Sequence, residues 1–115
     1  MGQYHILYNK TKKEFVHAHA LGCGLKLMEQ VGFEQSTSTA LWLLLANSNG
    51  RGGGDAKEHK LIGYWAGDRI VVQGDYAEPN DPSYLSPRVL DCYTDISEEV
   101  REMLKHQFGK EIKSW

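Results

Sequence analysis

The sequence predicts one α+β domain over residues 1–115, with an antiparallel sheet of four to five strands and about three helices packed on one face. Extended segments cluster into two hairpins rather than alternating with helices, which gives the order ββααβββα and favours antiparallel pairing. Hydrophobic residues make up 41% of the chain and charged residues 24%, a balance typical of a globular domain with a core.

The N-terminal part of the chain predicts a β-hairpin. Tyr4–Tyr8 and Glu14–His19 are rich in strand-forming residues, and a polar, turn-like segment separates them. Because successive side chains of a strand point to opposite faces, Tyr4, Ile6 and Tyr8 should share one face of the sheet.

Two short helices are expected next. Leu25–Val31 has apolar residues at helical spacing, and Gly32 is placed to follow its C-terminus. Ser36–Thr39 offers several N-cap residues for a second helix that ends at Leu45. Since Ala40–Leu45 is apolar on nearly every side, this second helix is predicted to be the buried one.

A second hairpin is expected in the middle of the chain. Lys60–Ala66 and Arg69–Tyr76 read as extended segments on either side of Gly67–Asp68. A two-residue connection that begins with glycine is typical of a type II′ turn.

The C-terminal third predicts a loop, a short edge strand and a helix. Ala77–Pro87 contains all three prolines and reads as the loop, and Val89–Tyr93 reads as the edge strand. Ser97 is a suitable N-cap for a final helix, and Gly109 should end or bend it. The apolar stripe of this helix is predicted to consist of Val100, Met103, Leu104 and Phe108.

Composition restricts the classes of function. The net charge of −2 argues against a basic nucleic-acid groove, and the apolar run Ala40–Ala46 is too short to span a bilayer. Two cysteines, Cys23 and Cys92, do not make a disulfide framework. We therefore expect a cytoplasmic protein with free thiols, no cofactor and no membrane association.

The glycine-rich segment Asn47–Asp55 is the first candidate site. Glycine lets backbone amides converge on an anion, and a guanidinium pairs well with phosphate or carboxylate. The segment has neither the Walker nor the Rossmann pattern, and a flexible helix-to-strand connection is the alternative. The residues predicted to bind a ligand here are Arg51, Gly52, Gly53, Gly54, Asp55, Trp65 and Arg69.

Histidines suggest a second candidate, a metal site. His17 and His19 are two residues apart on the predicted strand, so both should project to one face, and Cys23 follows beyond a turn. Two imidazoles and a thiolate suit zinc. The alternative is a partly exposed histidine pair beside a buried cysteine.

These observations lead to a hypothesis with two alternatives. The leading reading is a non-enzymatic binding module for an anionic, nucleotide-like small molecule or for an acidic surface of a protein partner. One alternative is a small metal-dependent or nucleotide or phosphoryl hydrolase that uses His17, His19, Asp55 and Asp75. The other is an inhibitor or immunity-like protein. An uncovered edge strand could also make the protein a homodimer.

Four segments of the sequence resemble those of a known group of proteins. Met1–His5, Gly24–Glu29, the loop Ser48–Asp55 and Trp65–Ile70 together resemble a group of small uncharacterised bacterial proteins that are also met in phage-like settings. The similarity runs from Met1 to about Val100. It implies a bacterial or phage-associated intracellular protein, and no site residue is carried over from it.

Overall fold

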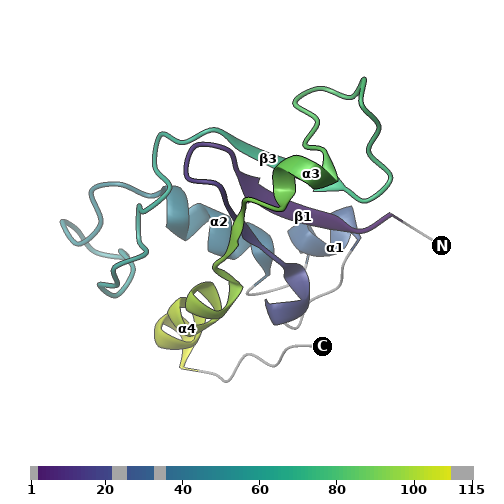
Figure 1. Ribbon diagram of the computed structural model, residues 1–115. Helices are drawn as coiled ribbons and strands as arrows, with labels where there is room; N and C mark the ends of the chain where they lie inside the picture. The colour runs from purple at the N-terminus through teal and green to yellow at the C-terminus, as the bar shows by residue number, and fades with distance from the viewer. Residues whose placement is uncertain (1–2, 22–25, 33–35, 110–115) are drawn as a thin grey trace.

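The structure is a computed structural model that describes residues 3–21, 26–32 and 36–109, with the backbone alone at His19 and Gly32. A four-stranded sheet has the order β3-β1-β2-β4 (Figure 1). Its strands are β1 (His5–Asn9), β2 (Glu14–Val16), β3 (Ile70–Gly74) and β4 (Thr94–Asp95). The α+β class is confirmed.

The helices are short apart from the last. They are the 3-10 helix η1 (Ala18–Leu21), α1 (Leu27–Gly32), α2 (Thr37–Leu45), α3 (Pro87–Leu90) and α4 (Ser97–Phe108). Among the described residues, no helix is long and apolar enough to cross a membrane.

The predicted N-terminal hairpin is confirmed, although its second strand is shorter than expected. β1 and β2 pair antiparallel, with Leu7 opposite Val16 and Asn9 opposite Glu14. β2 ends at Val16, and the chain then turns into η1 instead of continuing as a strand to His19.

The second predicted hairpin is wrong. β3 is a strand, but it pairs antiparallel with β1, with Leu7 opposite Val72. Residues 60–67 form consecutive turns, in which Tyr64 N donates to Leu61 O and Ala66 N to Gly63 O, at 3.1 and 3.0 Å. A strand therefore does not precede the Gly67–Asp68 turn.

The C-terminal end of α2 explains why this segment turns. Gly63 N donates to Leu43 O at 3.0 Å and Trp65 N donates to Leu44 O at 2.9 Å. Gly63 has φ of 79°, and a Cβ atom there would lie 2.6 Å from Ala46 O. Only glycine tolerates both this φ and this approach, so the backbone is held against α2 and not in a sheet.

The sheet is mixed, which corrects the prediction of a wholly antiparallel sheet. β4 pairs parallel with β2, with Glu14 opposite Thr94. The predicted edge strand Val89–Tyr93 is also wrong: Pro87–Leu90 is one helical turn, capped by the Ser86 hydroxyl, and the strand begins at Thr94.

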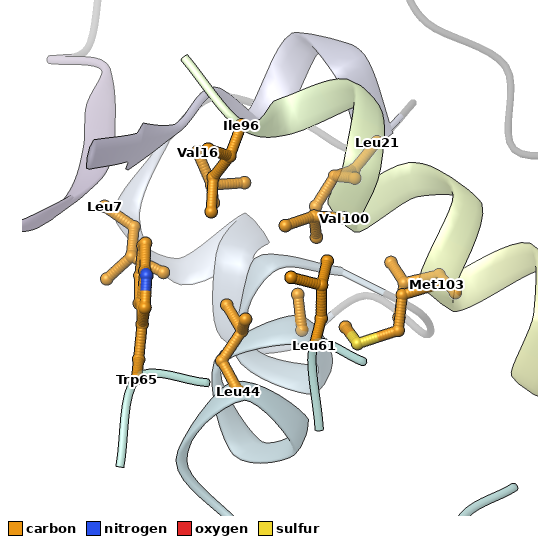
Figure 2. Close-up of a cluster of buried hydrophobic side chains, with 11 residues drawn as sticks. Leu7, Val16, Leu21, Leu44, Leu61, Trp65, Ile96, Val100 and Met103 are labelled. Carbon is orange, nitrogen blue, oxygen red and sulfur yellow. The ribbon is translucent and has the colours of Figure 1, made fainter. Parts of the chain in front are cut away.

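The main core lies between one face of the sheet, α2, α4 and the turns of residues 60–67. Figure 2 shows its side chains converging from these elements. The predicted stripe of α4 is confirmed for Val100, Met103 and Leu104, which are buried, whereas Phe108 is exposed. Gly109 takes the left-handed conformation and ends α4.

Two expectations about the helices are corrected. α2 is not buried on all sides, because Trp42 is 79% exposed and Leu45 is also exposed, while Ala40 and Leu44 face the core. The helices do not share one face either: α3 lies over the opposite face, where its Leu90 borders the same cavity as Ile6. The start predicted for the first helix, Leu25, lies outside the described residues.

Trp65 is the largest side chain of the core and is 0% exposed. Its indole Nε1 donates to Glu14 Oε1 at 2.9 Å, and the Tyr64 hydroxyl donates to Glu14 Oε2 at 2.9 Å. One carboxylate of the N-terminal hairpin thus fastens residues 64–65 to the sheet.

We expect Glu14→Ala to lower the free energy of unfolding by about 1–3 kcal/mol, because the buried indole N–H loses its acceptor. Tyr64→Phe removes only the hydrogen bond of the exposed hydroxyl and should cost at most about 1 kcal/mol. Urea denaturation of both variants measures the difference. Equal losses in the two variants would contradict a special role for the indole.

Candidate functional site

The glycine-rich loop already holds an anion, and that anion belongs to the chain. Asp55 Oδ2 accepts hydrogen bonds from the amides of Gly50, Arg51 and Gly52 at 2.8, 2.9 and 3.1 Å. The side chain of Asn49 closes the base of the loop, since its Oδ1 accepts from Ala56 N and its Nδ2 donates to Ala56 O. The loop projects from the molecule and is exposed (Figure 1).

This arrangement changes the acidity of the carboxyl group. Hydrogen bonds from Gly52, Gly50 and Arg51 lower the pKa of Asp55 below its ordinary value, because they stabilise the charged form. Amides do converge in this loop, but they are those of Gly50, Arg51 and Gly52 rather than those of Gly52, Gly53 and Gly54, and Asp55 engages all three.

Two other residues predicted for this site, Trp65 and Arg69, lie outside the loop. Trp65 is buried in the core and cannot stack on a ligand. Arg51 and Arg69 are exposed, and the backbone of Arg69 is tied to the turn between β1 and β2, where its N donates to Thr11 Oγ1 at 2.9 Å. Gly53 and Gly54 are exposed in the loop.

The strand geometry from which the metal site was predicted is not found, and the site itself stays a prediction. His17 lies just after β2, and its N donates to Ser97 Oγ at 2.7 Å. His19 belongs to η1, so the two histidines do not share one face of a strand. The side chain of His19 and all of Cys23 lie outside the described residues. Within the described ranges, no group of three or more histidine, cysteine, aspartate or glutamate residues is arranged to hold a metal ion.

A cavity of about 370 Å³ lies on the opposite face of the sheet from the main core. Residues of β1 and β3 form its floor, and Tyr84, Leu85, Pro87 and Leu90 form one wall. None of the residues predicted for the glycine-loop site borders it. Its lining residues are Tyr4, His5, Ile6, Tyr8, His17, Gln73, Gly74, Asp75, Ala77, Tyr84, Leu85, Pro87 and Leu90.

The alternation of β1 and β3 explains the floor of the cavity. Leu7 faces the core, so Ile6 and Tyr8 face the other way, as the sequence predicts, and Gln73 lies opposite Ile6 on β3. Tyr8 also packs against Tyr93, with ring centroids 6.1 Å apart. Burial raises the pKa of Tyr8, which keeps its hydroxyl neutral.

Gln73 holds the wall in place. Its Oε1 accepts from Leu85 N and its Nε2 donates to Leu85 O, both at 2.8 Å. The side-chain amide pairs with the backbone of Leu85 much as a neighbouring strand would. Tyr84, the residue before Leu85, thereby lies at the border of the cavity, as does Tyr8.

Two further groups give the cavity polar character. Asp75 Oδ1 accepts from Tyr4 N at 3.0 Å, which holds the carboxylate at the end of β3. His5 borders this cavity and also a smaller apolar one of about 120 Å³ on the core side. Among the described residues, His5 Nδ1 is the buried side-chain polar atom that lacks a hydrogen-bond partner.

Sequence reasoning missed this site because residues 77–87 read only as a loop. The shared face of Tyr4, Ile6 and Tyr8 was a usable signal, since aromatic side chains on the face away from the core need cover. Which segment supplies the cover depends on the contact between Gln73 and Leu85.

Comparison of the chain with protein-family models, with curated proteins and with solved structures found no match. The resemblance to small bacterial and phage-associated proteins stays a prediction.

A histidine pair lies elsewhere, where the segment after the glycine loop meets α4. The rings of His59 and His106 have centroids 5.7 Å apart, and His59 Nδ1 accepts from Leu61 N at 3.1 Å. Burial lowers the pKa of His59, and the charges of His106 and Lys60 lower it further. Gln107 fastens the same segment by hydrogen bonds with Lys57 N and O at 2.8 and 2.7 Å.

We expect Asp55→Ala to speed hydrogen exchange of the amides of Gly50, Arg51 and Gly52, because each loses its acceptor. Exchange in the core should not change, since the loop is exposed. Amide exchange followed by NMR measures this. A carboxyl pKa of Asp55 at its ordinary value of about 3.9 in an NMR titration would contradict the hydrogen bonding described.

His59 should make stability depend on pH. The folded protein has the lower pKa, so the unfolded chain binds more protons, and the free energy of unfolding should fall as the pH drops from about 7 through the folded pKa. Urea denaturation at a series of pH values in this range measures the free energy of unfolding. Its dependence on pH should be weaker for His59→Gln than for the parent. An unchanged slope would show that other groups cause the dependence.

Proposed function

We propose that this protein is a small-molecule binding module whose ligand carries a planar, hydrogen-bonding ring like that of a nucleobase. The observation that carries the proposal is the cavity of about 370 Å³ bordered by the three tyrosines Tyr4, Tyr8 and Tyr84. Its volume lies within the range of small-molecule sites, which is about 300–1,000 Å³.

Aromatic walls favour a planar ligand. Tyrosine presents a large, rigid face at low entropic cost, and a stacked base contributes about 1–3 kcal/mol to binding. Tyr8 and Tyr84 come from segments far apart in the sequence and both border the cavity, so a ring bound there has aromatic residues on its floor and on its wall.

The polar groups favour a ring that donates hydrogen bonds. The Asp75 carboxylate accepts from Tyr4 N through Oδ1, and its Oδ2 remains available to an amino or imino group of a ligand. His17 also borders the cavity. A nucleobase presents such donors and acceptors on its edge.

We assign the ring to the cavity and not to the glycine loop. The amides of Gly50, Arg51 and Gly52 already bind Asp55, so a phosphate would have to displace a carboxylate held by three hydrogen bonds. In this proposal, the ring supplies most of the binding free energy and a phosphate on the ligand adds little.

Calorimetric titration with a panel of nucleosides and their monophosphates tests the proposal. We expect one or more ring types to bind, with similar affinity for the nucleoside and the monophosphate. Tyr84→Ala should weaken binding about tenfold to hundredfold, the equivalent of a lost stacking contact.

Tyr76→Ala is the matched control, because Tyr76 is exposed and does not border the cavity. It should bind like the parent. Absence of heat for every member of the panel would overturn the proposal, and equal binding by Tyr84→Ala and the parent would place the ligand elsewhere.

A further inference from the structure

Among the described residues, β3 forms one edge of the sheet and pairs with β1 on its other side. Lys10 N donates to Arg69 O at 2.7 Å and Asp75 N donates to Tyr4 O at 2.9 Å, just beyond the two ends of β3. In an antiparallel ladder, alternate residues turn their N–H and C=O groups toward the neighbour. The backbone groups of Ile70, Val72 and Gly74 therefore point away from β1.

Within residues 70–74, the strand itself lacks the features that usually block pairing with another chain; the Gln3 side chain lies over Gly74 and accepts from Tyr76 N just beyond the strand. Edge strands are commonly protected by charged residues, proline, bulges or short length. Ile70–Gly74 contains no charged residue and no proline, and its first three residues are β-branched. The opposite edge, β4, has only two residues.

We propose that β3 pairs antiparallel with β3 of a second copy of this chain, about a twofold axis at Val72. In this register, Val72 lies opposite the partner's Val72, and Ile70 lies opposite the partner's Gly74. The N–H and C=O groups that point away from β1 then meet their equivalents, because both members of each pair face outward. The two four-stranded sheets become one continuous sheet.

Charge complementarity identifies the second copy as the occupant. The same register places Arg69 directly opposite the partner's Asp75, and symmetry repeats this pair at the other end of the strand. Both residues are exposed, and among the described residues neither side chain forms a salt bridge within its own chain. A strand with opposite charges at its two ends is complementary to itself only in the antiparallel direction.

Apolar surface beside the edge supports the same contact. Val72 is 44% exposed, and with Leu27 and Val31 of α1, also exposed, it borders the cavity of about 120 Å³ on the core side of the sheet. In the antiparallel pair, the partner's Val72 meets this surface. Backbone pairing, apolar contact and end charges thus select the same register.

Sedimentation velocity over a concentration series tests the proposal with a charge exchange. The parent should be dimeric, and Arg69→Asp should raise the dimer dissociation constant about tenfold, because two attractive pairs become repulsive. The double variant Arg69→Asp, Asp75→Arg should restore the parent dissociation constant. Arg51→Asp, which changes an exposed arginine in the glycine loop, is the control and should dimerise like the parent.

A cross-link tests the axis directly. In a background of Cys23→Ser and Cys92→Ser, Val72→Cys places two thiols across the twofold axis, within reach of a disulfide. Oxidation should give a covalent dimer for Val72→Cys and not for Trp42→Cys, an exposed position on α2.

Three results would overturn the proposal. One is a parent that stays monomeric at every concentration. Another is a dimer that Arg69→Asp leaves unchanged. The third is a covalent dimer formed by Trp42→Cys but not by Val72→Cys, which would place the contact on α2.

Discussion

The rest of the structure depends on a buried indole that needs a hydrogen-bond acceptor. Trp65 is 0% exposed, and Glu14, near the start of β2, accepts from its N–H. A buried donor without a partner costs about 1–3 kcal/mol, so the residues around Trp65 are held where the carboxylate can reach. The backbone of Trp65 is held in turn by Leu44 at the C-terminal end of α2. The N-terminal hairpin and α2 are thereby fastened to one side chain.

This constraint also shapes the sheet. Because residues 60–67 are taken up by turns that cover the core face, they cannot serve as the partner strand of β3. β3 therefore pairs with β1, and its other side becomes an edge. The same pairing extends the floor on which the tyrosine-lined cavity is built. Both the floor of the proposed site and the edge proposed for the dimer contact thus result from the pairing of β3 with β1.

Local patterns predicted the local parts of the fold. The hairpin of β1 and β2 and the apolar stripe of α4 each lie within a short stretch of sequence, and both were found, apart from the exposed Phe108 in the stripe. The strand predicted at Lys60–Ala66 failed because Gly63 and Trp65 donate to carbonyls of α2, a tertiary interaction that overrides strand propensity. The parallel pairing of β2 with β4 joins segments about 80 residues apart, which periodicity does not report.

For the candidate sites too, features within one short segment could be predicted, whereas contacts between distant segments could not. The sequence predicted a glycine loop with converging amides, but the amides that converge are those of Gly50, Arg51 and Gly52, and they bind Asp55 at the end of the same segment. Glycine content alone does not reveal which amides converge or whether they are free. The face shared by Tyr4 and Tyr8 could be predicted, whereas its cover could not. That cover depends on Gln73, whose amide can pair with any extended backbone and pairs here with Leu85. The wall of the cavity is thus set by a tertiary contact, the pairing of the Gln73 side-chain amide with the backbone of Leu85. The sequence contains every residue that lines the cavity, but it does not show which segment this amide binds.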